Sequence, residues 1–284
     1  MKRVLLLMVF MAILLAAFAG CKKNRQTDQP AQPVQSEQSE QFEGDQSFAD
    51  IQQKGKFIMG FDDSFPPMGF KENGEYVGFD IDLAREVTKR LGVELVLQPI
   101  IWDVKEQELN TGKIDCIWNG FTMTPEREAA LTFTKPYMNN KQVVIVPAAS
   151  PVQTLSDLNG KKLALQRDSS AFEALNKFPE VKNSLKELLQ FEDNLMAMTD
   201  LDTGNCDAVL MDIIVANFNY IAKNPDKYRI LDESMADERF GVGFRKSDVT
   251  LKDKVEAALV EMANDGSMSE ISDKWFGDDI TTLK

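Results

Sequence analysis

The sequence predicts an α/β protein with two lobes, each a mostly parallel sheet flanked by helices. Short apolar runs of strand length alternate with longer segments of helical period, which is the pattern of βαβ units. The alternation starts again near residue 162. A similar turn precedes a strand in both halves, at residues 111–117 and 203–209.

The first half supplies strands and helices with clear ends. Residues 79–91 form an amphipathic pattern that ends at Gly92, a residue favoured just after a helix. Thr124 and Pro125 predict another helix start, because Thr can cap a helix and Pro suits its first position. The expected strands are 56–61, 93–99 and 114–118.

The second half repeats this order with a strand at 162–166, a helix at 170–177 and a segment at 185–190 that leads to another crossover. Residues 111–117 (TGKIDCI) align with 203–209 (TGNCDAV) as a helix end, a glycine turn, an aspartate and a strand. This similarity indicates two related lobes.

The path between the lobes follows from the remaining apolar runs. Residues 143–147 can carry the chain out of the first lobe, and 240–245 can carry it back. A helix at 251–264 then ends at Asp265 and Gly266. We therefore expect lobe 1 to be discontinuous and a ligand cleft to lie between the lobes. The expected domains are lobe 1 at 48–144 and 240–284, and lobe 2 at 145–239.

The N-terminus has the features of an exported protein. Lys2 and Arg3 precede an apolar run, 4–18, which is shorter than the roughly 20 residues of a membrane-spanning helix. Residues 18–21 (FAGC) resemble the lipobox of bacterial lipoproteins, which implies a signal peptide at 1–20 and lipidation of Cys21. An ordinary signal peptide with a chance cysteine is the alternative. Residues 21–47, rich in Gln, Ser, Glu and Pro, predict a flexible tether.

Composition excludes several classes of function. The chain has no histidine, which removes Ser-His-Asp and Cys-His triads and histidine metal sites. A formal net charge of −13 argues against nucleic-acid binding. We expect no catalytic residue, metal or cofactor, although carboxylate acid–base chemistry stays open. Cys116 and Cys206 fall in different lobes, so two buried free thiols are favoured over a disulfide.

Five segments together resemble the family 3 extracellular solute-binding proteins, which serve polar amino-acid ABC importers and have the type II periplasmic-binding-protein fold. The resemblance covers about residues 48–277, and its segments stand in the family's order. They are 77–84 (VGFDIDLA), 119–127 (NGFTMTPER), 206–212 (CDAVLMD), 240–245 (FGVGFR) and 265–277 (DGSMSEISDKWFG).

The resemblance implies a site for the backbone of a free amino acid. Arg127 would bind the carboxylate through two hydrogen bonds, a geometry that lysine cannot reproduce. The N–H groups of Thr122 and Ser170 would share that carboxylate. Asp212 would bind the ammonium, helped by the Gly120 carbonyl and the Thr122 hydroxyl. The alternatives are a solvated helix charge for Arg127 and a helix N-cap for Asp212.

The resemblance also implies which residues face the ligand's side chain. Asp62 falls where relatives that bind basic amino acids have a carboxylate. Phe65 and Trp102 fall where aromatic or apolar residues sandwich the side chain, and core packing is their alternative. Gln166 replaces a lysine of some glutamine-binding relatives, and Asn119 replaces a small residue. Asp62 favours a cationic or strongly polar amino acid, but which one stays open.

The expected function is extracytoplasmic binding of a polar amino acid, with closure of the lobes and delivery to an ABC permease. We expect a single copy, tethered to the cell membrane through Cys21. Two alternatives belong to other classes. One is a cyclohexadienyl-type dehydratase on the same fold, with Asp62 or Glu173 as general acid. The other is a ligand sensor for a separate membrane protein.

Overall fold

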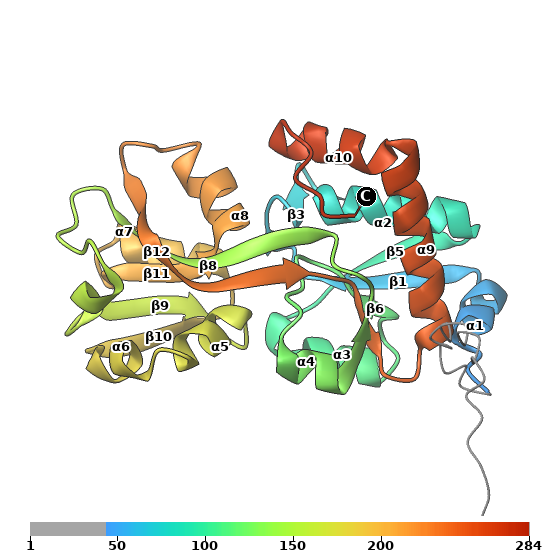
Figure 1. The fold of residues 1–284 in the computed structure, drawn as a ribbon, viewed down its shortest axis with the longest axis horizontal. Coiled ribbons are helices and arrows are strands. Elements are labelled where there is room, and N and C mark those ends of the chain that lie inside the picture. Colours follow the sequence, from blue (N-terminus) through green and yellow to red (C-terminus); the bar gives the residue numbers. More distant parts are fainter. Residues whose placement is uncertain (1–43, 284) are drawn as a thin grey trace, which may run out of the picture. The chain divides into compact units, whose positions relative to one another are not determined.

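The computed structural model describes residues 44–283 (Figure 1). The expected signal peptide at 1–20, Cys21 and the expected tether up to residue 43 lie outside the described residues. Helix α1 spans Ser47–Lys54. The segment just before α1 is joined to the C-terminal part of the chain, because the Asp45 carboxylate accepts a hydrogen bond from the backbone N–H of Thr250.

Lobe 1 is the part built on the sheet with strand order β5-β1-β6-β13-β7. β1 pairs in parallel with β5 and β6, and β13 pairs antiparallel with β6 and β7. The sheet is therefore mixed, because the chain returns to it from lobe 2 in the opposite direction. Its strands are β1 (Lys56–Phe61), β5 (Glu94–Pro99), β6 (Cys116–Ile117), β7 (Leu131–Phe133) and β13 (Gly243–Arg245).

The helices of lobe 1 bury one face against this sheet and against each other. α2 buries Phe79, Leu83 and Val87 at helical spacing and ends at Gly92, whose φ of 70° is left-handed. A small antiparallel sheet joins β1 to α2: β2 (Ser64–Phe65), β3 (Gly69–Glu72) and β4 (Glu75–Val77). The helices are α1, α2 (Phe79–Leu91), the 3₁₀ turn η1 (Trp102–Val104), α3 (Lys105–Asn110), α4 (Pro125–Ala130), α9 (Val249–Asp265) and α10 (Ser267–Phe276).

Lobe 2 is the part built on the sheet with strand order β10-β9-β11-β8-β12. β9 pairs in parallel with β10 and β11, whereas β8 pairs antiparallel with β11 and β12. The strands are β8 (Met138–Pro147), β9 (Lys162–Gln166), β10 (Glu187–Phe191), β11 (Ala208–Asp212) and β12 (Tyr228–Phe240). The helical segments are η2 (Leu155–Leu158), α5 (Ser170–Asn176), α6 (Pro179–Ser184), α7 (Asn194–Asp202), α8 (Ile213–Ala216) and the π turn η3 (Asn217–Ile221).

The long strands β8 and β12 carry the chain out of lobe 1 and back (Figure 1). They pair from Tyr228 and Pro147 to Phe240 and Met138, with two register shifts. Burial alternates along the first half of β8, so Asn140 and Gln142 are buried while Lys141 is exposed. Glu238 of β12 faces the same side as the buried Phe240. Polar side chains therefore point inward where the chain crosses between lobes.

The two aligned turns have the same local structure. Gly112 and Gly204 are left-handed, with φ of 75° and 73°. The aspartate that follows each turn caps a neighbouring strand: Asp115 accepts from Ile58 N–H at 2.7 Å, and Asp207 accepts from Lys162 N–H at 2.8 Å. The sequence similarity therefore reflects a shared way of fixing the turn to the adjacent strand.

The α/β architecture with two sheet-based lobes is confirmed, and most predicted elements are present. The strand expected at 114–118 is short, because only Cys116 and Ile117 pair with β1 and one further residue of β13 joins them. The helix expected at 251–264 begins earlier, at Val249, and ends at Gly266 as expected.

Cys116 and Cys206 are buried and free. No helix within residues 44–283 has the length and apolar character needed to cross a membrane.

Candidate functional site

A pocket lies where the two lobes meet, and every residue that the sequence analysis assigned to the ligand lines it. The free volume inside is about 10 Å³, room for about one water molecule. Ser169 is a lining residue that the sequence analysis did not name. The lining residues are Asp62, Phe65, Trp102, Asn119, Gly120, Thr122 and Arg127 from lobe 1, and Gln166, Ser169, Ser170 and Asp212 from lobe 2.

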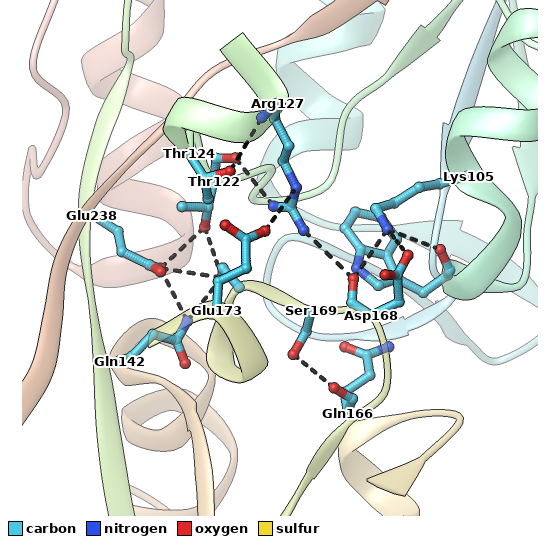
Figure 2. A network of polar contacts seen from close by, with 12 residues as sticks. Lys105, Thr122, Thr124, Arg127, Gln142, Gln166, Asp168, Ser169, Glu173 and Glu238 are labelled. Atoms are coloured by element: carbon cyan, nitrogen blue, oxygen red, sulfur yellow. Dashed lines mark hydrogen bonds and ion pairs between the residues drawn. The ribbon is translucent and has the colours of Figure 1, made fainter. Parts of the chain in front are cut away.

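Arg127 is held in place from its own helix. Thr124 is the N-cap of α4 and its hydroxyl accepts from Arg127 N–H, as the sequence predicted for this helix start. The Arg127 side chain is 5% exposed, and its guanidinium lies over the Phe121 ring, 4.7 Å from the centroid. It donates to the Thr122 carbonyl at 3.1 Å and lies 3.7 Å from the Glu173 carboxylate (Figure 2). Arg127 is thus a buried cation and not a solvated helix charge.

The turn at Gly120 brings main-chain groups to the pocket. Gly120 has a φ of 55°, and an added Cβ would lie 3.1 Å from the Phe65 ring and 3.2 Å from the Phe240 ring. Glycine is therefore the residue that this close approach favours. The Gly120 N–H donates to the Asp80 carboxylate at 2.6 Å, and the Tyr137 hydroxyl donates to the same oxygen at 3.0 Å. Burial raises the pKa of Asp80 to about 7.

Asp212 ends β11 and stands at the N-cap position of α8, but its side chain makes no capping hydrogen bond. Its Oδ1 atom instead accepts from Asn140 Nδ2 at 2.6 Å and from Gln142 Nε2 at 2.9 Å. Burial, with the Glu238 charge as the second cause, raises the pKa of Asp212 to about 8. The capping alternative therefore fails for its side chain, which faces the pocket.

Asp62 and Gln166 meet across the pocket. The Gln166 amide donates to Asp62 Oδ2 at 2.8 Å and to the Glu192 carbonyl at 3.0 Å. The other Asp62 oxygen accepts from Ser64 N–H at 2.8 Å. Burial raises the pKa of Asp62 to about 6, against the lowering effect of these hydrogen bonds. Asn119 accepts from Asp62 N–H at 3.2 Å, so it positions the segment that carries the carboxylate.

Phe65 and Trp102 are apolar walls of the pocket. Both are buried, at 6% and 7% exposure. Trp102 contacts the Phe121 ring edge to face at 5.7 Å, so it also belongs to a small core cluster of lobe 1. The two readings of the sequence, cleft wall and core residue, both apply to Trp102.

Further hydrogen bonds cross between the lobes beside the pocket. The Ser170 hydroxyl of lobe 2 donates to the Thr122 hydroxyl of lobe 1 at 3.1 Å. Lys105, only 1% exposed, donates to the Asp168 carboxylate at 2.6 Å and to its carbonyl at 3.0 Å (Figure 2). Arg167 likewise contacts Asp103. These pairs hold the lobes against each other in this structure.

Sequence reasoning missed Glu238, Asn140, Gln142 and Lys105. Glu238 Oε2 accepts hydrogen bonds from the Thr122 hydroxyl and from both amides of β8, and it lies 3.3 Å from the Ser170 hydroxyl oxygen. A signal existed for Glu238, because residues 236, 238 and 240 alternate with exposed Asp237 and Arg239. An acidic residue on the inward side of a strand indicates a polar site.

The pocket is lined by one guanidinium and two carboxyl groups, and Glu238 lies next to it in contact with the lining residue Thr122. Arg127 can hold a carboxylate through parallel N–H groups. Asp62, Asp212 and Glu238 can accept hydrogen bonds from cationic or neutral donors. The described residues are thus suited to a small zwitterion with additional donor groups.

Comparison with known proteins identifies the family. Residues 57–278 match the model of the bacterial extracellular solute-binding proteins, family 3. The match spans most of the chain, and this protein belongs to that family. Its fold is the type II periplasmic-binding-protein fold of the similar solved structures.

Individual relatives cover nearly the same residues. The L-cystine-binding protein TcyJ of Escherichia coli strain K12 is 29% identical over 83% of this chain and 90% of that protein. The structure of Tv2483 bound to L-arginine is 34% identical with a TM-score of 0.81, covering 84% of this chain and 98% of that one. An ABC uptake transporter substrate-binding protein from Streptococcus pneumoniae with bound histidine is 39% identical with a TM-score of 0.80, covering 84% and 99%.

Proposed function

We propose that this protein binds a polar amino acid outside the cytoplasm, with a basic one favoured, and delivers it to an ABC-type permease. The observation that carries the proposal is the opposed pair in one pocket: buried Arg127 from lobe 1 and buried Asp212 from lobe 2. A free amino acid has a carboxylate and an ammonium on one carbon, so it can join these two groups. Relatives named for cystine, arginine and histidine binding support this class of ligand.

The ligand's carboxylate is assigned to Arg127, with the N–H groups of Thr122 and Ser170 as further donors. The ammonium is assigned to Asp212, with the Gly120 carbonyl and the Thr122 hydroxyl as further acceptors. Serine 170 opens α5, so its N–H is one of the groups that a helix leaves without an intrahelical partner. These roles explain why residues from both lobes are needed for one small ligand.

The ligand's side chain is assigned to the part of the pocket formed by Asp62, Gln166, Asn119, Phe65 and Trp102. Asp62 gives this region a carboxyl group, and the aromatic walls can contact an aliphatic or planar side chain. With two lining carboxyl groups, and Glu238 beside them, against one guanidinium, a ligand that carries an extra positive charge suits the pocket better than a neutral one.

Binding requires the lobes to separate and close again. The free volume of about 10 Å³ admits no amino acid, and Asp62–Gln166 and Thr122–Ser170 hydrogen bonds close the pocket. We assign the hinge to β8 and β12, which join lobe 1 (48–144 and 240–284) to lobe 2 (145–239). A ligand that contacts both lobes favours the closed arrangement, which is the form expected to dock on the permease.

Calorimetric titration of the full chain with L-arginine, L-histidine and L-cystine tests the proposal. The wild type should bind at least one of them with micromolar or tighter affinity. Arg127→Ala should abolish binding, and Arg127→Lys should weaken it at least about tenfold because lysine cannot form the paired hydrogen bonds. Arg239→Ala, which removes an exposed arginine of β12, is the matched control. Unchanged affinity in Arg127→Ala would refute the assignment.

We further propose that Cys21 becomes lipidated after removal of residues 1–20 and tethers the domain to the cell membrane. Two or more acyl chains give stable membrane binding. Expression in a bacterium supplied with a labelled fatty acid should give labelled protein in the membrane fraction. Cys21→Ser should release unlabelled protein, whereas Cys206→Ala, at a buried thiol, should leave labelling unchanged. Equal labelling of Cys21→Ser would contradict the anchor.

The proposal assigns no chemical reaction to the pocket, in line with relatives that are named as binding proteins. Incubation with cyclohexadienyl acids should therefore give no product. Turnover that is lost in Asp62→Asn would instead favour the dehydratase alternative.

A further inference from the structure

Two carboxyl groups of the pocket region share the same hydrogen-bond donors. Asn140 Nδ2 donates to Asp212 at 2.6 Å and to Glu238 at 2.8 Å. Gln142 Nε2 donates to the same two oxygens at 2.9 and 3.0 Å. The two carboxyl oxygens are therefore at most two hydrogen-bond lengths apart. Both amides come from β8, and Glu238 lies opposite Asn140 in the β8–β12 register.

Hydroxyl groups complete the surroundings of Glu238 on its other side. The same Oε2 atom accepts from the Thr122 hydroxyl at 3.0 Å (Figure 2). The Ser170 hydroxyl oxygen lies 3.3 Å from it. Thr122, Ser170 and Asp212 all line the ligand pocket. Glu238 thus contacts the pocket's lining residues from the strand that joins the lobes, next to the residue assigned to the ligand's ammonium.

The pair lacks a cationic partner within the described chain. No lysine or arginine of residues 44–283 forms an ion pair with Asp212 or Glu238, although the charge of Arg127 acts on Asp212 from a greater distance. Asn140 Oδ1 and Gln142 Oε1 are buried and accept no hydrogen bond from any described residue. Unpaired buried acceptors beside two carboxyl groups indicate a place for a positively charged donor.

Two carboxylates this close cannot both be charged at low cost without such a donor. Burial and the neighbouring Glu238 charge raise the pKa of Asp212 to about 8. At neutral pH Asp212 therefore retains its proton in the absence of a cation. An arriving ammonium supplies three N–H donors and a positive charge, which favours the fully ionised pair.

We propose that Asp212 and Glu238 together bind the ligand's ammonium, and that this cation displaces a proton held on Asp212. Glu238 is then a further residue that determines specificity, because an uncharged or acylated amine cannot replace the proton. The inference rests on the proposed function, since it takes the ligand to be an amino acid. The displaced proton passes to solvent, so affinity for the amino acid rises with pH.

The other charged groups near the pair are separate from it. Arg127 of α4 contacts Glu173 of α5, and Lys105 of α3 contacts Asp168. On the outward face of the same strands, Lys141 lies 3.5 Å from Asp237. Asp62 lines the same pocket but shares none of the pair's hydrogen-bond donors. Burial raises the pKa of Asp62 to about 6, so its titration is largely complete by about pH 7.

Calorimetric titration of the full chain with L-arginine tests the inference, between about pH 7 and pH 8 and in buffers of different ionisation enthalpy. If a screen selects another amino acid, that one replaces arginine. Wild type should bind about fivefold more tightly at the higher pH and release a proton on binding. The Nα-acetyl derivative, which lacks the ammonium, should not bind.

Glu238→Gln removes one of the two charges while keeping the side chain's shape. It should bind about tenfold more weakly at the higher pH, with a weaker pH dependence and less proton release than the wild type, because burial alone still raises the pKa of Asp212. Asp237→Asn makes the same charge change on the exposed side of β12 and should match wild type in affinity and pH dependence.

Two results separate the inference from the proposed function. Wild type that binds an amino acid without proton release, or Glu238→Gln with wild-type affinity and pH dependence, overturns the inference and leaves the proposed function intact. Wild type that binds no amino acid overturns both. If Glu238→Gln fails to fold by circular dichroism, the presence or absence of proton release on binding by the wild type decides whether the inference holds.

Discussion

Individual polar residues around the pocket are satisfied largely by one another across the lobes. Thr122 pairs with Ser170, and Asp62 pairs with Gln166, across the lobes. Within lobe 1, the Asp80 carboxylate accepts a hydrogen bond from the Gly120 N–H. A ligand must replace the first two contacts but leaves the third in place. Asp80 is therefore a positioning residue, which fixes the turn that presents main-chain groups to the pocket.

Asp80 also makes stability depend on pH. Its pKa is raised to about 7 by burial, above the ordinary value of 3.8. The folded chain therefore holds this proton more tightly than the unfolded chain. The stability that Asp80 contributes is fully present below about pH 4 and is lost as the pH rises through about 7.

Asp80→Asn should flatten this dependence. Between about pH 5 and pH 8, the free energy of unfolding should fall by about 2 to 3 kcal/mol less in the variant than in wild type. Urea unfolding at several pH values measures the difference, and Asp273→Asn, at an exposed position of α10, is the control. A variant whose pH dependence equals that of wild type would show that Asp80 is not the titrating group.

At the scale of elements, local signals located most helices and strands. Gly92 and Gly266 ended α2 and α9 as predicted, because left-handed backbone favours glycine. The length of β8 was underestimated, since the sequence indicated only 143–147 while the strand begins at Met138. Residues 139–142 are all polar, so the sequence gives no strand signal there. They form a strand because they pair with β12.

The same dependence on strand pairing explains which residues of the site could not be predicted from the sequence. The residues named for the ligand were found through motifs that resemble a family, and they line one pocket. Asn140, Gln142 and Glu238 were missed because their positions depend on the pairing of two strands about a hundred residues apart in sequence. Lys105 was missed because a lysine at a helix start gives no sign that it will be buried.

The junction between β4 and α2 gives a prediction at this scale. Gly78 has a φ of 144°, and an added Cβ would lie 2.3 Å from the Met68 carbonyl oxygen. Gly78→Ala should lower the free energy of unfolding by about 2 kcal/mol or more. Gly74→Ala, at a turn with open space around it, should cost about 1 kcal/mol. Equal losses in urea unfolding would contradict a steric requirement at Gly78.

At the scale of the whole domain, polar contacts join the two lobes around the pocket, while one apolar cluster includes residues of both lobes. Lys105–Asp168 and Arg167–Asp103 lie beside the pocket, and Asp62–Gln166 crosses it. Such contacts are exchangeable with water at modest cost. This composition is suited to a domain that opens to admit a ligand and closes around it.

The central claim is that a free amino acid binds between the lobes, and a thermal-shift screen of the full chain tests it most directly. The chain is refolded first to remove carried-over ligand, then heated with each standard amino acid and with ornithine, citrulline and cystine. A ligand at a hundredfold excess over its Kd adds about 2.7 kcal/mol to the folded state, which raises Tm by several degrees. We predict the largest rise for a basic or other polar amino acid. A chain whose Tm responds to none of them would contradict the account.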